Sequence, residues 1–222
     1  MKKIEDISII EFEMPVLGSK MYCMIKNEEA IIVDPCLNDN MMSVLSKVKR
    51  ARVILTHEHI DHISGVNLVR NIVADCEVIC SRKCAERIGD PCKSLAKYLD
   101  AMFCMRNAKE QEIIKRLNLC GYACSADIYF ENEYSFSWQG IKIKCIEMPG
   151  HSIGSIGIII DNKLFFSGDS LLKNVHVTTS LPGGSKKDFH SITVPLIEAL
   201  PNEMLVYPGH GESFILGENE FI

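Results

Sequence analysis

The stretch from Thr56 to Gly65, which reads Thr-His-Glu-His-Ile-Asp-His-Ile-Ser-Gly, constrains the fold more than any other part of the sequence. It follows directly on Arg52-Val53-Ile54-Leu55, a run rich in β-branched residues that predicts a buried strand. Three histidines and one aspartate fall within six residues where this strand ends. Imidazole and carboxylate suit zinc, iron and manganese, and a loop at a strand end leaves their metal open to substrate. We therefore predict a metal centre here.

Three further candidate ligands occur later in the chain in a similar local context. His151, Asp169 and His210 each follow an apolar run that reads as a strand, and each stands directly after a glycine. Glycine lets the backbone turn tightly, so that a side chain can reach a shared centre. A single His-x-His pair is more often structural than metal-binding. The number of candidates, which includes five of the seven histidines, favours the metal centre.

In this order and spacing, these residues resemble the metallo-β-lactamase fold superfamily of metal-dependent hydrolases. The motif His-x-His-x-Asp-His at 57–62 carries the resemblance, together with the three later candidates, and the match extends over nearly the whole chain. The segment Ile31-Ile32-Val33-Asp34-Pro35 resembles the first motif of the superfamily. In that motif, Asp34 would support the metal loop from behind the ligands without binding the metals itself.

Two segments point to a branch within the superfamily. Leu181-Pro182-Gly183-Gly184-Ser185 and Tyr207-Pro208-Gly209-His210-Gly211 look like the glyoxalase II-like, or hydroxyacylglutathione hydrolase-like, branch. Glyoxalase II carries a C-terminal domain that binds glutathione, whereas about a dozen residues follow His210, so we expect a member that lacks this domain. The branch often has a basic residue and an aspartate just before Leu-Pro-Gly-Gly, where this chain has Thr178-Thr179-Ser180. The expected substrate is therefore a small ester, thioester or lactone, and not specifically a glutathione thioester.

The resemblance implies an α/β fold, a four-layer αββα sandwich, formed by residues 1–222 as one domain. The alternation of strand-like and helix-like segments agrees with two sheets covered by helices. From Arg82 to Leu119 the apolar spacing becomes helical, with Leu95, Tyr98, Leu99, Met102 and Phe103 on one expected face. We predict a helical insertion at about 82–119 that serves as a lid or as an oligomer contact. A later helix is expected between Lys187 and Leu200, where Pro195 must lie at a break or near a terminus.

The scheme of the superfamily implies two metal positions. Three histidines would hold one ion, an aspartate and two histidines would hold the other, and one aspartate would bridge both: His57, His59 and His151; Asp61, His62 and His210; and Asp169. The ions are expected to be two divalent metals, Zn²⁺ first, with iron or manganese as alternatives. A hydroxide shared between them would attack the scissile carbonyl. Asp61 is also a candidate for proton transfer.

Two other functions remain open on the same ligands. An iron-dependent sulfur (persulfide) dioxygenase resembles this chain in using His57, His59 and His151 with Asp169 around one iron, and nitrogen and oxygen ligands alone do not exclude iron. A non-catalytic metal-binding protein is the third alternative. A flavodiiron protein is not expected, because that branch has a glutamate where this chain has His59.

Composition and termini limit the partners. The net charge of -5, without a block of lysine and arginine, argues against nucleic acid as the main substrate. The apolar runs, such as Ile156–Ile160, are far shorter than the ~20 residues of a membrane span. After Lys2 and Lys3 the chain turns acidic before an apolar segment could form, so no signal peptide is read, which also disfavours an exported β-lactamase. We expect a cytoplasmic protein with a small-molecule substrate, no nucleic acid or membrane partner, and a homodimer as one option.

The ten cysteines contain no Cys-x-x-Cys pair, so we expect free thiols in a reducing compartment. A second metal site that uses Cys120 and Cys124 is a minor alternative. Cys36 lies close to Asp34 in the sequence, but a packing role is the simpler interpretation. Four basic side chains outside the motif are candidates for weaker roles, as anion contacts or as groups facing the cleft: Lys173, Lys186, His176 and His190.

Overall fold

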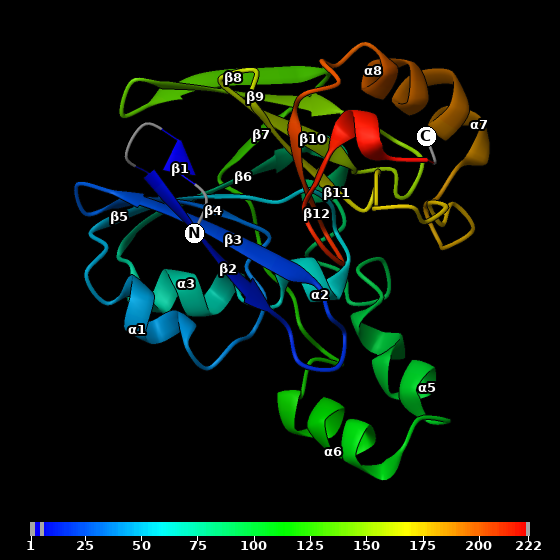
Figure 1. The fold of residues 1–222 in the computed structure, drawn as a ribbon. Helices are drawn as coiled ribbons and strands as arrows, with labels where there is room; N and C mark the ends of the chain where they lie inside the picture. The colour runs from blue at the N-terminus through cyan, green and yellow to red at the C-terminus, as the bar shows by residue number, and fades with distance from the viewer. Residues whose placement is uncertain (1–2, 5–6, 221–222) are drawn as a thin grey trace.

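The computed structural model describes residues 3–4 and 7–220; positions 1–2, 5–6 and 221–222 of the predicted 1–222 domain lie outside the described residues. Two β-sheets face each other in the middle of the molecule (Figure 1). The first has seven strands in chain order: β1 (Lys3–Ile4), β2 (Ile7–Glu13), β3 (Lys20–Lys26), β4 (Glu29–Val33), β5 (Arg50–Ile54), β6 (Asp75–Ser81) and β7 (Ile128–Phe130). The second has six strands in the order β13-β12-β11-β10-β9-β8. These are β8 (Glu133–Trp138), β9 (Ile141–Glu147), β10 (Ile156–Ile160), β11 (Leu164–Gly168), β12 (Leu205–Pro208) and β13 (Phe214–Ile215).

Strand direction follows from the connections. The turn between β3 and β4 is a tight hairpin in which Asn27 and Glu28 both have positive φ, so these strands are antiparallel. From β4 to β7 the strands are parallel, because longer connections containing helices return the chain to the same edge. The first of these helices are α1 (Met41–Leu45), α2 (Ile60–Ile63) and α3 (Val66–Ile72). The carboxyl ends of β4 and β5 therefore lie side by side.

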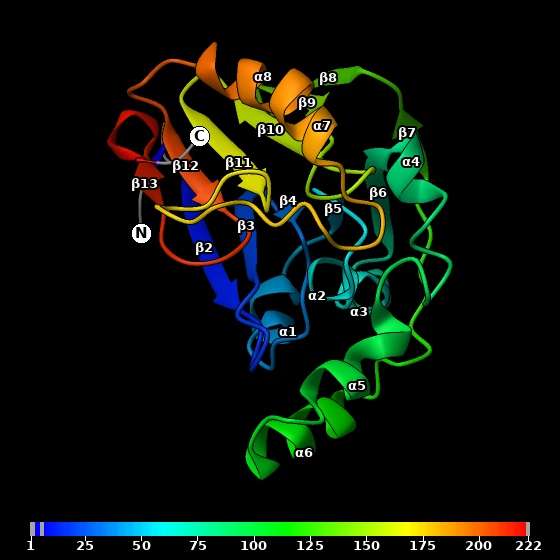
Figure 2. The ribbon, with the colours of Figure 1, turned by 90° about the vertical axis from the view of Figure 1, so that its right-hand side faces the viewer.

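Alternating side chains on each strand build three apolar layers. On β4, Ile31 and Val33 face the other sheet, whereas Ile32 faces α1 and α3 on the outside. On the second sheet, Ile158 and Phe166 face inward, and the outward Phe165 packs with residues of the C-terminal helices. The described chain thus forms the four layers helix, sheet, sheet, helix, and the predicted αββα sandwich is confirmed (Figures 1 and 2).

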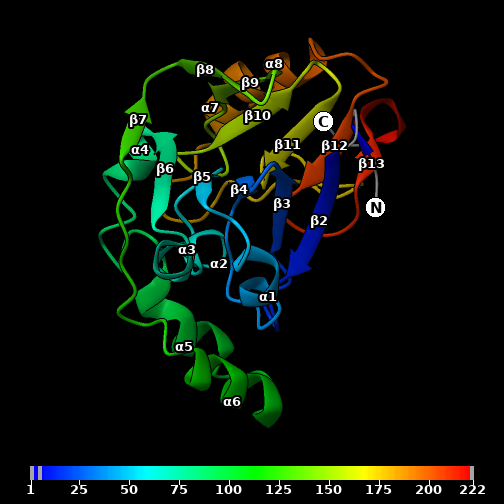
Figure 3. The ribbon, with the colours of Figure 1, turned by 90° about the vertical axis from the view of Figure 1, so that its left-hand side faces the viewer.

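The segment 82–119 is helical only in pieces. It contains α4 (Arg82–Ala85), η1 (Ala96–Tyr98), α5 (Leu99–Phe103) and α6 (Ala108–Leu117), with turns over 86–95. The predicted apolar face was wrong in part: Leu95, Leu99 and Phe103 are buried, but Tyr98 and Met102 are 44% and 53% exposed, because the helices on which they would share a face are too short to align them. The α5 and α6 helices project from the sandwich in all three views (Figures 1, 2 and 3).

The helices that cover the second sheet are α7 (Lys186–Asp188), the π-helix η2 (Phe189–Thr193) and α8 (Val194–Glu198). Pro195 lies in the first turn of α8, near a terminus as predicted, because its missing N–H has no partner to lose there. A last short turn, η3 (Leu216–Glu218), follows β13. Among the described residues, no helix combines the length and apolar character needed to cross a bilayer.

Candidate metal centre

The candidate ligands lie beyond the carboxyl ends of four strands that open on one edge of the sandwich. The motif at 57–62 follows β5, and His151, Asp169 and His210 follow β9, β11 and β12. Strands β11 and β12 are parallel, and β9 runs in their direction because it pairs with β10 antiparallel, as β11 does. An isolated bridge between Ser19 and His210 ties the end of the second sheet to the first. Both sheets therefore deliver their ligands to the same place.

Three imidazoles form the first group. His57 Nε2 lies 3.1 Å from His59 Nδ1, which lies 3.0 Å from His151 Nε2. His151 Nδ1 donates to the carbonyl oxygen of Thr178 at 2.8 Å, which turns Nε2 toward the group. All three side chains are buried. The structure thus brings together the three histidines predicted for one metal.

Asp61, His62 and His210 form the second group. Asp61 Oδ2 lies 3.4 Å from His62 Nε2 and 3.3 Å from His210 Nε2, and the two ring nitrogens are 3.3 Å apart. These are the three residues predicted for the second metal.

Asp34 stands behind the second group. Its Oδ2 is 3.0 Å from His62 Nδ1, on the side of the ring that faces away from the group. It also accepts hydrogen bonds from the backbone N–H and hydroxyl of Thr56 at 2.6 and 2.5 Å. Asp34 thereby fixes the ring of His62 and the start of the metal loop, which is the supporting position that the sequence predicted.

Asp169 lies between the two groups. Its Oδ1 is 3.5 Å from His62 Nε2, and its Oδ2 is 3.5 Å from both His151 Nε2 and His210 Nε2. A Cβ on Gly209 would overlap Asp169 Oδ1, so only glycine leaves room for the carboxylate here. The bridging role predicted for Asp169 matches this position.

Burial and neighbouring charges adjust the protonation of these groups. Burial and the neighbouring imidazoles lower the pKa of His57 well below its ordinary value. Burial and His151 lower the pKa of His59 to about 3, although Asp61 and Asp169 act in the opposite direction. Burial also lowers the pKa of His62, but Asp61, Asp169 and Asp34 outweigh it and raise the value to about 10. Burial raises the pKa of Asp61, but His62 and His210 outweigh it and hold the carboxyl ionised. His57, His59 and Asp61 are thus in the form that binds a cation.

These donors fit divalent metal ions. His59 Nε2 and Asp169 Oδ1 are buried without a hydrogen-bond partner, which is costly unless another group satisfies them. Asp61, Asp169 and Asp34 raise the pKa of His62, so these carboxylates favour a positive charge at this position. Imidazole and carboxylate together suit zinc, iron and manganese, and they do not select among these metals.

Other predicted candidates lie elsewhere. Cys36 is buried with its Sγ 4.0 Å from the carbonyl oxygen of Ser19, a packing position. Lys173 pairs with Glu212 at the surface. The remaining candidates, His176, His190 and Lys186, line a separate cavity of about 380 Å³.

All ten cysteines are free thiols. Cys120 is exposed and Cys124 is half-buried, and neither belongs to a group of converging metal donors among the described residues. Among the described residues, Cys120 and Cys124 therefore form no metal site in addition to the histidine cluster.

Sequence reasoning missed a second set of charges beside the ligands. Glu58, between two of the ligating histidines, is fully buried; it pairs with Arg87 and accepts a hydrogen bond from Ser152. No local signal marks this contact, because the three residues come from distant segments and only the tertiary fold joins them.

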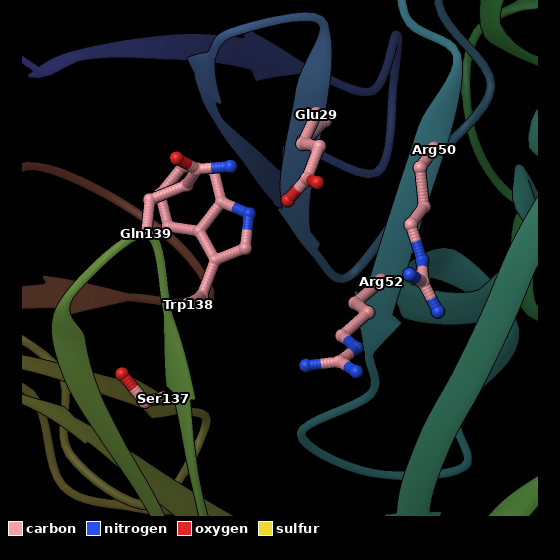
Figure 4. A pocket seen from close by; sticks show the side chains of 7 residues that line it. Glu29, Arg50, Arg52, Ser137, Trp138 and Gln139 are labelled. Atoms are coloured by element: carbon pink, nitrogen blue, oxygen red, sulfur yellow. The ribbon is translucent and has the colours of Figure 1, made fainter.

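A different cavity, of about 320 Å³, lies at the opposite end of the sheets (Figure 4). Arg50 and Arg52 from β5 line one wall, and Trp138 at the end of β8 lines another. Arg52 pairs with Glu77 at 3.0 Å and Arg50 with Asp75 at 3.4 Å. Because these charges are balanced within the protein, we place the candidate centre at the histidine cluster.

Known proteins resemble the chain along most of its length. The sequence model described as "Metallo-beta-lactamase superfamily" matches residues 16–210. A probable metallo-hydrolase of Streptococcus pyogenes serotype M6 is 26% identical over 89% of this chain and 81% of its own. A hydroxyacylglutathione hydrolase of Dictyostelium discoideum is 26% identical over 88% of this chain, which spans 64% of that protein. The mitochondrial persulfide dioxygenase of Homo sapiens is 23% identical over 83% of this chain and 60% of its own. Among solved structures, the BLEG-1 B3 metallo-beta-lactamase superposes with a TM-score of 0.75 at 24% identity over 95% of both chains.

Proposed function

The chain belongs to the metallo-β-lactamase superfamily, and on that premise we propose that it is a metal-dependent hydrolase that uses two divalent ions to cleave a small ester, thioester or lactone. The observation that carries the proposal is the convergence of two donor groups on either side of one carboxylate. His57, His59 and His151 form one group; Asp61, His62 and His210 form the other; and Asp169 lies within 3.5 Å of both.

Two ions held by these residues would supply a water of lowered pKa and would polarise the scissile carbonyl. The protein supplies their placement. Asp34 holds Nδ1 of His62, and Thr178 accepts from Nδ1 of His151, so that both rings keep Nε2 turned toward the centre. Asp61 is ionised, which is the form that binds a metal. As the candidate for proton transfer, its carboxylate would take a proton from the attacking water and give it to the leaving group.

The substrate class rests on the relatives and on the sequence around the site. The hydrolase relatives, one of them named as acting on a hydroxyacylglutathione, support hydrolysis and the glyoxalase II-like branch. Residues Thr178-Thr179-Ser180, which replace the basic residue and aspartate often found there, support a smaller or different acyl substrate. The cytoplasmic location, the lid or dimer role of segment 82–119 and the lack of a nucleic-acid partner stay predictions.

The deciding experiment is elemental analysis of the purified full chain, from cells grown without added metal. Close to two equivalents of zinc, manganese or iron per chain, with turnover in a panel of esters, thioesters and lactones, is the expected result. The panel should be repeated after metal removal and after metal return, since turnover must follow metal content. Protein that holds no metal under any loading condition would overturn the proposal.

A mononuclear iron persulfide dioxygenase is the second candidate function. The human persulfide dioxygenase relative supports it, as does the first donor group, which is complete without the second. In that case one equivalent of iron and oxygen consumption with glutathione persulfide are expected, with no hydrolysis in the panel. A non-catalytic metal-binding protein would show bound metal and neither activity.

A further inference from the structure

Glu58 occupies an unusual place for a carboxylate. It stands between His57 and His59, and in an extended backbone successive side chains point to opposite sides. The two imidazoles turn toward the donor group with His151, whereas the Glu58 side chain is fully buried and pairs with partners outside that group. A buried carboxylate is costly unless other groups pair with it, so its partners determine what it does.

The first partner ties Glu58 to the third histidine of the group. Ser152 Oγ donates to Glu58 Oε2 at 2.8 Å, and Ser152 directly follows His151. The same hydroxyl lies 2.9 Å from Ser155 Oγ, which closes the turn after His151. Through this hydrogen bond, the backbone that carries His57 and His59 is joined to the backbone that carries His151.

The second partner is Arg87, in the turn after α4. Its Nε lies 2.6 Å from Glu58 Oε1, and its Nη2 donates to the carbonyl oxygen of Pro182 at 3.3 Å and that of Lys93 at 3.5 Å. One guanidinium therefore joins the metal loop to the segment 82–119 and to the segment 178–185.

The 178–185 segment is itself bound to the donor group. Thr178 accepts the hydrogen bond of His151 Nδ1, and Ser185 N–H donates to the carbonyl oxygen of Gly150 at 2.8 Å. Gly183 has a φ of +98°, and a Cβ there would lie 2.8 Å from Arg87 Nη2, so glycine lets the guanidinium approach this backbone. Arg87 thus contacts the same segment that orients His151.

We propose that the Glu58–Arg87 pair is a positioning brace, which holds the loop of His57 and His59, the turn of His151 and the segment 178–185 at the spacing that a metal ion in the first group requires. The inference rests on the proposed function, because it assigns a role toward a metal in that centre. Glu58 and Arg87 are positioning residues and not ligands: they act on the three ring nitrogens through Ser152, Pro182 and the peptide backbone.

The brace is distinguishable from an ion pair that only stabilises the fold. A purely structural pair would change the unfolding of the metal-free protein and leave the metal site unaltered once the protein is folded. A brace changes the affinity and ligand field of a metal in protein that is still folded. Cobalt(II) reports both the metal affinity and the ligand field, because its visible absorption appears on binding and depends on the arrangement of its ligands.

The experiment uses the full chain freed of metal by a chelator, with Co²⁺ alone as the probe. Binding affinity, dissociation rate and visible spectrum are compared for the wild type, Arg87→Met, Arg87→Lys and the double variant Glu58→Gln with Arg87→Met. Arg82→Met is the matched control, because Arg82 is on the same insertion and its ion pair with Glu131 is exposed. Circular dichroism checks that each variant is folded.

We expect Arg87→Met to weaken Co²⁺ binding by about 10- to 100-fold, with faster dissociation and a changed spectrum, as for loss of a group that orients ligands. The Co²⁺ affinity of Arg87→Lys should lie between those of Arg87→Met and the wild type, because one ammonium cannot contact both Glu58 and Pro182 as a guanidinium does. The double variant should bind better than Arg87→Met, since no buried carboxylate is left unpaired. Arg82→Met should match the wild type.

If Arg87→Met does not fold, the Co²⁺ affinities of Arg87→Lys and of the double variant, each compared with the wild type, decide the outcome. Folded Arg87 variants that bind Co²⁺ with the affinity and spectrum of the wild type would overturn the brace, even if their metal-free forms unfold more easily. Wild-type protein that binds no Co²⁺ would overturn the proposed function and the brace with it. Binding by the wild type with no difference among the variants overturns the brace alone.

Discussion

The two ends of the sandwich both carry charged side chains, but they balance the charge differently. At the end away from the histidines, Arg50 pairs with Asp75 and Arg52 pairs with Glu77. Arg52 also lies over the ring of Phe136. At the other end, Asp34, Asp61 and Asp169 face a cluster of imidazoles whose pKa values are shifted in opposite directions.

The difference shows which end needs something from outside the protein. Guanidinium and carboxylate neutralise each other, so the first end is complete as the chain folds. A neutral imidazole neutralises a carboxylate only if it takes up a proton. In addition, His59 Nε2 and Asp169 Oδ1 remain buried without a hydrogen-bond partner. The end with the histidines therefore has the donors of a metal centre, and perturbation at the two ends should have separate consequences.

The largest effect is expected from Asp169→Asn. The amide keeps the size of the side chain but removes the charge that lies between the two donor groups. Loss of a group that only orients a ligand costs about 10- to 100-fold in metal affinity, so loss of the bridge should cost at least ~100-fold and abolish turnover, with the fold retained. Metal content and hydrolysis of the active substrate measure this. Full activity at undiminished metal content would defeat the dinuclear assignment.

A smaller effect is expected from Gly209→Ala. The new methyl group would overlap Asp169 Oδ1 and lie 2.8 Å from His62 Cε1, so these ligands must move. We expect metal affinity to fall by about 10- to 100-fold, the range for displaced ligand support. Gly121→Ala is the matched control, because a Cβ there meets nothing within 4 Å. Titration with Zn²⁺ against a competing chelator measures the metal affinity of both variants. Equal affinities would contradict the predicted displacement of Asp169 and His62.

The third prediction concerns pH and the metal-free protein. His59 has a pKa of about 3 when folded, against an ordinary 6.5, and burial lowers that of His57 in the same direction. The unfolded chain thus binds more protons below pH 6.5, and each group should remove about 1.4 kcal/mol of stability per pH unit there. His62 has a folded pKa of about 10, so its contribution is complete below pH 6.5 and is lost progressively as pH rises from 6.5 to about 10.

Urea unfolding of metal-free protein between pH 7.5 and 5 tests this prediction. Below pH 6.5 the free energy of unfolding should fall toward acid, and His59→Asn should show a shallower fall because one of the two responsible groups is gone. The ion pairs of Arg50 and Arg52 contain no histidine and should add nothing in this range. Stability that is constant from pH 7.5 to 5 would contradict the burial of neutral imidazoles.

The smallest effect is expected at the opposite end. Arg52→Met removes a half-buried ion pair with Glu77 and a contact over Phe136, and such pairs contribute about 1 kcal/mol or less. The midpoint of unfolding should fall slightly, while metal content and turnover stay at the wild-type level. A loss of metal in this variant would show that the two ends are coupled and that the contrast between them is false.

Much of the fold was predictable because it depends on local patterns. The β-branched run Arg52–Leu55 predicted a buried strand, and β5 ends within it with Val53 and Ile54 buried. The segment 82–119 was predicted less well. Its helices are short, and burial of Leu95 and Leu99 but not Tyr98 depends on which side of each helix meets the rest of the protein. That choice is made by packing and not by spacing along the chain.

By itself, the sequence determined the family and the donor set, because metal ligands must be particular residue types and their order along the strands is a strong pattern. Only the tertiary structure decided how the donors divide into two groups, with Asp169 between them and Asp34 behind His62. It also decided that Glu58 meets Arg87 and Ser152, a contact between residues far apart in the chain. The physical reason is that ligand chemistry resides in single side chains, whereas distances and buried charge pairs arise only when distant segments pack together.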